Sequence, residues 1–302
     1  MADVTLAKNS TTLEKERSVA EATRAEVAGT PDPVAPALAA VSGPPLALVA
    51  GLTVWRGVRS LLAIAIFLAV WETLPRTGVV DRVFLPPFSE VLTALKDLAV
   101  SGQLWENTQA SLVRSLAGFG ISLALAIPLG LVLGWYKPVA EFLNPLLEVF
   151  RNTAALALLP VFVLILGLGE TSKISIVVYA CAWPILLNTI AGVKGVDPLL
   201  IKSARSLGLP AHRLFQKVIL PAAVPTIFTG IRLAGAYSIL ILVAAEMVGA
   251  KAGLGFLIND SQFNFRIPDM YAGIVAISVI GLAFNALLLR LERRFSTWRT
   301  TQ

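Results

Sequence analysis

Residues 202–221 read KSARSLGLPAHRLFQKVILP, a polar and basic stretch set between two long apolar runs. Ala, Leu, Arg and Lys favour helix. Gly208 followed by Pro210 predicts the end of one helix and the start of another, with Gly208 at the C′ position and Pro210 at N1. The stretch therefore predicts a helix–turn–helix outside the bilayer. Leu214 and Phe215 would give the second helix an apolar edge, which suits either a lipid surface or a groove in a partner protein.

The composition on both sides of this stretch is that of a membrane protein. The chain has 302 residues, of which 56% are apolar and 15% charged, whereas soluble domains average about 25% charged residues. The mean hydropathy is +0.76. The formal charge of +6 raises the question of nucleic acid, but no basic stripe interleaved with aromatic residues is present. We therefore expect a lipid bilayer around the chain and no nucleic-acid partner.

Six apolar runs approach the length of about 20 residues that a membrane-spanning helix needs. They are about 58–74, 112–134, 146–167, 172–192, 225–248 and 270–290. The sequence thus predicts an all-α, polytopic membrane protein with about six transmembrane helices. Between the first two runs, residues 88–100 have the apolar spacing of a short amphipathic helix.

An even number of spans places both termini on the same side of the membrane. Basic residues collect in the loops of that side: Arg56, Arg59, Lys137, Lys194, Lys202, Arg205, Arg213, Lys217, Arg290, Arg293, Arg294 and Arg299. Because basic loops stay in the cytoplasm, we expect both termini and the stretch 202–221 there. We expect a flexible tail with an interfacial segment or linker over 1–55, a transmembrane domain over 56–298, and a short tail over 299–302.

Most familiar catalytic and metal sites are excluded by what the chain lacks. Its single cysteine, Cys181, and single histidine, His212, leave no disulfide and no Cys/His metal cluster. There is no G-x-x-x-x-G-K-[ST] loop for a nucleotide and no assembled nucleophile and base. An intramembrane hydrolase or transferase would need paired catalytic groups at one depth, which we do not find. A self-sufficient ion-coupled carrier stays open as an alternative.

Polar residues inside the apolar runs are candidates for function because they are expensive to insert. Glu246 lies near the outer end of the fifth run, where it either lines or gates a solute path or reaches water at the interface. Glu148 and Arg151 are three residues apart, so they share a helix face and suit a structural ion pair. Trp183 and Asn188 lie in the fourth run and either contact a polar solute or pack in the core.

At this point the sequence resembles a known family, the permease subunits of bacterial binding-protein-dependent ABC importers with the type I fold. The family signature is E-A-A, three residues, Gly, nine residues, then I-x-L-P. Here Ala204, Gly208, Leu220 and Pro221 stand at the matching positions, while Lys202 replaces the family's Glu. Ser203 replaces an Ala and Val218 an Ile.

Longer phrases resemble the nitrate, sulfonate, taurine and bicarbonate branch of this family. They are LPPFSEVL at 85–92, SLVRSLAGFGISLALAIPLGLVLG at 111–134, LPVFVLILGLGETSKI at 159–174 and IFTGIRLAGAYSILILVAAEMVGAKAGLGFLI at 227–258. One departure is that Ala154 and Ala155 stand where the branch usually has two prolines.

The resemblance implies a transport subunit of an ATP-driven importer for a small oxyanion in the bacterial inner membrane. It implies three partners: a second permease chain in a homodimer, cytoplasmic ATPase subunits that bind ATP and Mg²⁺, and an outer-face solute-binding protein. No cofactor would bind this chain. The coupling segment that docks the ATPase would contain Lys202, Ala204, Gly208, Pro210, His212, Arg213, Phe215, Leu220 and Pro221. The path or gate would contain Glu246, Met247, Arg151, Asn152, Trp183 and Asn188.

Overall fold

A computed structural model describes residues 46–295, with most side chains from residue 59 onward. The predicted tail over 299–302 and residues 1–45 of the predicted tail over 1–55 lie outside this range. The chain divides after Phe67 into two compact units. The first unit contributes only the beginning of the first helix to the described residues, so the account below concerns the second unit, from Leu68 onward.

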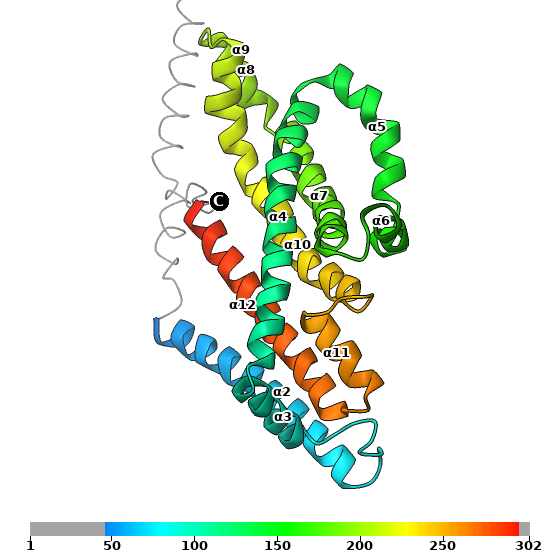
Figure 1. Cartoon of the computed structure of the whole chain (residues 1–302). Helices are drawn as coiled ribbons and strands as arrows, with labels where there is room; N and C mark the ends of the chain where they lie inside the picture. Colours follow the sequence, from blue (N-terminus) through cyan, green and yellow to red (C-terminus); the bar gives the residue numbers. More distant parts are fainter. Residues whose placement is uncertain (1–45, 296–302) are drawn as a thin grey trace, which may run out of the picture. The chain divides into compact units, whose positions relative to one another are not determined.

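The described residues form helices joined by short turns and contain no strand (Figure 1), which confirms the all-α prediction. The segment η1 is a 3₁₀ helix and η2 a π-helix. The elements are α2 (Leu46–Arg76), α3 (Phe88–Val100), α4 (Gln103–Trp135), α5 (Lys137–Arg151), η1 (Ala155–Leu158), α6 (Leu159–Leu166), α7 (Glu170–Lys194), α8 (Pro198–Ser206), α9 (Ala211–Leu214), η2 (Phe215–Ile219), α10 (Leu220–Glu246), α11 (Leu254–Phe263) and α12 (Ile267–Phe295).

Four described helices are long and apolar enough to cross a membrane: α4, α7, the continuous helix from Ala211 to Glu246, and α12. The bent pair of α5 and α6 makes a fifth candidate. The first predicted span, about 58–74, falls within α2, where part of the side chains are not described. The amphipathic helix expected over 88–100 is confirmed as α3, which buries Val91, Ala94 and Leu98.

The third span differs from the prediction of one helix over 146–167. The structure has two helices, α5 and α6, that meet at an angle of 83°. At the end of α5 the side chains of Asn152 and Thr153 donate hydrogen bonds to the carbonyls of Glu148 (2.7 Å) and Val149 (3.0 Å). The prediction of one helix was wrong because an apolar run records the length of a span but not a bend within it.

Two stripes of residues spaced four apart hold α4 against α7. The stripe on α4 consists of residues with small side chains: Gly118, Ser122, Ala126, Gly130 and Gly134. The stripe on α7 consists of buried residues with larger side chains: Val177, Cys181, Ile185, Thr189 and Val193. A Cβ on Gly130 would lie 2.6 Å from the Cβ of Thr189, so the two backbones approach as closely as the small residues permit. Gly118, Gly130 and Gly134 take part in this close approach, whereas a Cβ on Gly120 would meet nothing within 4 Å.

Candidate functional site

The segment over 198–221 forms a helix, a tight turn and a second helix. Asp197 caps α8 by accepting a hydrogen bond from the backbone N–H of Leu199 at 2.8 Å. At the other end the N–H of Gly208 bonds to the carbonyl of Arg205 (2.9 Å), and that of Leu209 to the carbonyl of Ala204 (3.2 Å). This pair of bonds is a Schellman motif. Gly208 at C′ has φ +74°, as its predicted role requires.

The second helix of this segment runs into α10 without a break. Pro210 is the N-cap of α9, one position before the predicted N1. After α9 the backbone widens into the π-turn η2, closed by a bond from the N–H of Leu220 to the carbonyl of Phe215. Pro221 follows directly. Its ring would collide with the carbonyl four residues earlier in a regular helix, which accounts for the wider turn.

The apolar edge of this helix faces the chain's own core. Leu214 is buried, and Phe215 packs edge-on against Trp135 of α4 with ring centroids 5.3 Å apart. Leu214 and Phe215, the apolar edge expected to contact lipid or a partner's groove, therefore contact other residues of the same chain. The outward surface of the segment 198–221 is mainly basic, with three exposed apolar side chains: Leu199 (68% exposed), Leu200 (52%) and Leu207 (80%). The exposed basic residues are Lys202, Arg205, His212, Arg213 and Lys217.

At the opposite end of α10, Glu246 is fully buried. Its carboxylate forms an ion pair with Arg114 of α4 at 2.7 Å. It also accepts a bifurcated hydrogen bond from the Ser111 hydroxyl, at 2.9 and 2.8 Å to its two oxygens, and one of 3.0 Å from the N–H of Gly255. The side chain is 0% exposed, so the alternative in which Glu246 reaches water at the interface is wrong. Its role in a path or gate stays a prediction.

Arg114 joins three parts of the fold around this carboxylate. It also pairs with Glu170 at the start of α7 and donates a 2.6 Å hydrogen bond to the carbonyl of Ala252. The loop 247–253 is fixed further by a bond of 2.8 Å from the N–H of Gly253 to the side chain of Asn107. Sequence reasoning missed Arg114, Ser111 and Asn107. The sequence did hold a signal for Arg114: it lies in the second apolar run and Glu246 in the fifth. Because charged residues within a membrane pair with one another, the two could have been predicted to meet.

The remaining predicted path residues lie in three different settings. Arg151 pairs with Glu148 at 3.2 Å, which confirms the predicted ion pair. Asn188 bonds to the carbonyl of Pro184 at 2.8 Å and lies at the contact of α7 with α10, where a Cβ on Gly230 would be 2.6 Å from its own Cβ. Met247 is partly exposed.

Trp183 stacks edge-on against Tyr179 at a centroid distance of 5.7 Å. Within the described residues, its buried indole N–H has no hydrogen-bond partner. The indole therefore carries a free donor in addition to its packing surface.

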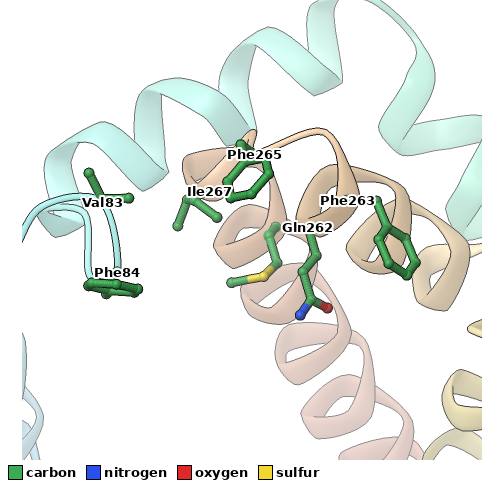
Figure 2. A pocket seen from close by; sticks show the side chains of 7 residues that line it. Val83, Phe84, Gln262, Phe263, Phe265 and Ile267 are labelled. Atoms are coloured by element: carbon green, nitrogen blue, oxygen red, sulfur yellow. The ribbon is translucent and has the colours of Figure 1, made fainter.

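A shallow apolar hollow of about 410 Å³ lies between the loop before α3 and the turn from α11 to α12 (Figure 2). Phe84 faces it from the loop, and Gln262 faces it from α11. Phe263 and Phe265 beside it are strongly exposed. Because α11 follows the end of α10 that carries Glu246, this hollow lies at the end of α10 opposite to the segment 198–221. Its residues are Val83, Phe84, Gln262, Phe263, Phe265, Ile267 and Met270.

Comparison with known proteins gives consistent results. The chain is 34% identical over 243 residues to the putative aliphatic sulfonates transport permease protein SsuC of Bacillus subtilis, covering 80% of this chain and 88% of that protein. It is 34% identical to the taurine transport system permease protein TauC of Escherichia coli (79% and 89% covered). It is 31% identical to the nitrate import permease protein NrtB of Synechocystis (78% and 88%).

Solved structures support the fold. A chain of the MetNI methionine ABC transporter, in an inward-facing conformation, aligns with a TM-score of 0.56 at 17% identity, covering 62% of this chain and 94% of that one. A chain of an amino acid ABC transporter aligns with a TM-score of 0.54 at 21% identity, covering 66% and 97%. Residues 126–297 match the family described as binding-protein-dependent transport system inner membrane component. With these relatives and this helical fold, the chain belongs to that family and is a multi-pass membrane permease subunit of an ABC importer.

Proposed function

We propose that this permease carries a small oxyanion, such as nitrate, bicarbonate, taurine or another sulfonate, across the bacterial inner membrane into the cytoplasm. The names of the relatives support this class, since they are an aliphatic sulfonate, a taurine and a nitrate permease. The basic loops support a topology with both termini in the cytoplasm. The residues 198–221 then lie on the cytoplasmic side and the hollow of Figure 2 on the outer side.

The structure of the segment 198–221 is the observation that carries the proposal. Its inner face is anchored by Leu214 and Phe215, and its outer face is exposed and basic. A rigid, outward-facing basic helix with a defined turn suits docking on a second protein. We assign it as the coupling segment that meets a cytoplasmic ATPase. That ATPase binds ATP and Mg²⁺, while the permease itself holds no cofactor.

The continuity of the coupling segment with α10 supplies a path for force. ATP would close the ATPase pair and move the segment, and the helix from Ala211 to Glu246 would carry that movement through the membrane. At its far end it meets the Arg114–Glu246 ion pair and the loop 247–253. A second permease copy would complete the solute path, and a solute-binding protein would deliver the solute at the outer face. The cycle is alternating access by rigid-body movement.

The test of docking is Gly208→Asp, which places a negative charge at the exposed turn of a basic surface. We expect uptake to be lost and the ATPase to be uncoupled from solute, while the protein remains in the membrane. Asp197→Asn, which keeps the N-cap of α8, is a control. Wild-type uptake by Gly208→Asp, or failure of any ATPase to co-purify, contradicts the proposal. A thermal-shift screen of oxyanions on the cognate binding protein identifies the solute.

A further inference from the structure

One face of α5 carries a polar stripe along its whole length. Lys137, Glu141, Asn144, Glu148 and Arg151 recur at intervals of four and three residues, which places them on a single helix face. All five side chains are exposed or half-exposed. The contacts of α5 with its own chain are made elsewhere on the helix, by Leu143 and Leu147, which pack against the main core.

This stripe lies at membrane depth. The helix α5 begins directly after the end of α4, where Trp135 packs against the coupling segment (Figure 1). It ends where the hydroxyl of Tyr179 donates a 2.6 Å hydrogen bond to the carbonyl of Phe150. Tyr179 is close to the middle of α7, which runs from Glu170 to Lys194. In the topology given under Proposed function, the stripe therefore covers the inner half of the bilayer, where charged side chains do not face lipid.

The break after α5 concentrates donors at the middle of the membrane. Arg151 has one carboxylate partner, Glu148, and their side chains remain 42% and 45% exposed. A half-exposed pair contributes little to stability, so Glu148 can be exchanged for another anion. The indole N–H of Trp183, for which the described part of the chain offers no hydrogen-bond partner, lies one helical turn beyond Tyr179 on α7. In membrane transporters, discontinuous helices near mid-depth commonly form solute sites.

We propose that the polar stripe of α5 lines the inner half of the solute path, and that Arg151 is its anion contact. The oxygens of an incoming oxyanion replace Glu148 on the guanidinium. The planar fork of arginine suits this exchange because it matches the spacing of two oxygens on a carboxylate, sulfonate or nitrate. The inference that the solute is an oxyanion rests on the proposed function. The exposure of the stripe is a property of the structure and does not depend on that function.

Cysteine labelling tests the stripe without transport. Asn144→Cys and its matched control Phe142→Cys are made in a Cys181→Ala background, which removes the chain's single cysteine. Phe142 is 83% exposed in the isolated chain but lies off the stripe. Inverted membrane vesicles containing the transporter are treated with a charged, membrane-impermeant maleimide. We expect Asn144→Cys to react, Phe142→Cys to be protected, and vanadate trapping of the ATPase to slow the reaction.

Equal labelling of both positions overturns the inference. Labelling of Asn144→Cys that vanadate leaves unchanged also overturns it, because α5 would then be a helix on the membrane surface. If no ATPase co-purifies, the proposed function fails, but the comparison of the two cysteines still tests the stripe.

Transport kinetics test the anion contact. Nitrate, bicarbonate, taurine and ethanesulfonate are offered in parallel, and the transported anion is used. We expect Arg151→Gln to raise KM about 10- to 100-fold, the value of a charged hydrogen bond, with Arg151→Lys intermediate. Glu148→Gln should lower KM, because it removes the competing carboxylate. The control is Asp269→Asn in the Arg266–Asp269 pair, which has the same spacing. A purely structural pair would make Arg151→Gln and Glu148→Gln equally defective with unchanged KM, and that result overturns the assignment.

Discussion

Arg114 and Glu246 form a buried ion pair of 2.7 Å although 132 positions separate them in the sequence. The pair joins the N-terminal half of α4 to the C-terminal end of α10, and Arg114 extends the connection to α7 through Glu170. A buried pair of this kind is no guarantee of net stability, but removal of one partner leaves an uncompensated charge.

Glu246→Gln should destabilise the protein more than Glu170→Gln. The first change removes a carboxylate that is 0% exposed, and loss of one partner in such a pair costs about 3 kcal/mol or more. Glu170 is 63% exposed, so water compensates for its loss. The melting temperatures of the two variants in detergent give the order. If Glu246 also gates the path, Glu246→Gln should alter uptake rate or stimulated ATPase activity; equal melting temperatures and unchanged transport would contradict both roles.

Gly253→Ala should loosen the loop 247–253. Gly253 has φ +127°, and a Cβ there would collide with the carboxylate of Glu246. The exposed Lys251 in this loop is a trypsin site, so we expect faster cleavage at Lys251 in the variant than in the wild type. Gly120→Ala, which meets nothing within 4 Å, should leave the rate unchanged. An unaltered cleavage rate in Gly253→Ala would show that the loop is held without this contact.

Gly130→Ala should weaken the packing of α4 on α7. The new Cβ would lie 2.6 Å from the Cβ of Thr189 and 3.1 Å from the carbonyl of Leu186, and neither atom can move without shifting α7. Overpacking of this kind costs about 1–3 kcal/mol. Gly120→Ala is the control on the same helix and should be neutral or slightly stabilising. Recovery of folded protein by size-exclusion chromatography, together with melting temperature, measures the difference.

Gly208→Val and Gly208→Asn should show whether the backbone conformation of Gly208 matters for coupling. Both variants add a side chain at the same exposed position, but only Asn tolerates the positive φ. The φ of +74° at Gly208 costs an ordinary L-residue about 1–2 kcal/mol, more so for a β-branched one, whereas Asn tolerates the left-handed region. We expect Gly208→Val to reduce coupled ATPase activity and uptake, and Gly208→Asn to retain most of both. Equal activity of the two variants would mean that the Schellman turn does not position the coupling segment.

Local signals in the sequence predicted much of this fold. The amphipathic helix over 88–100 is α3 with the same bounds, because the spacing of its apolar residues is itself the helical repeat. The turn at Gly208 was predictable because only glycine adopts its backbone angle freely. The pair Glu148–Arg151 followed from a separation of three residues.

Other features are not visible in the hydropathy or spacing of the sequence. The third span bends between α5 and α6, although its apolar run reads as one helix. Leu214 looked like an edge for a partner, but Val193, Ile219 and Ala223 of its own chain form the cluster around it. Glu246 was singled out as a costly charge, yet its partners Ser111 and Arg114 come from a helix more than a hundred residues earlier.

The sequence by itself determined the membrane class, the positions of most long helices, the basic helix–turn–helix over 198–221 and the family. Each depends on composition or on residues close together in the chain, so hydropathy and spacing are enough. Only the tertiary structure decided which charges meet, which apolar edges are already covered, and where a span is bent. The first two outcomes follow from the close packing of α4, α7 and α10, which brings distant side chains within hydrogen-bond reach.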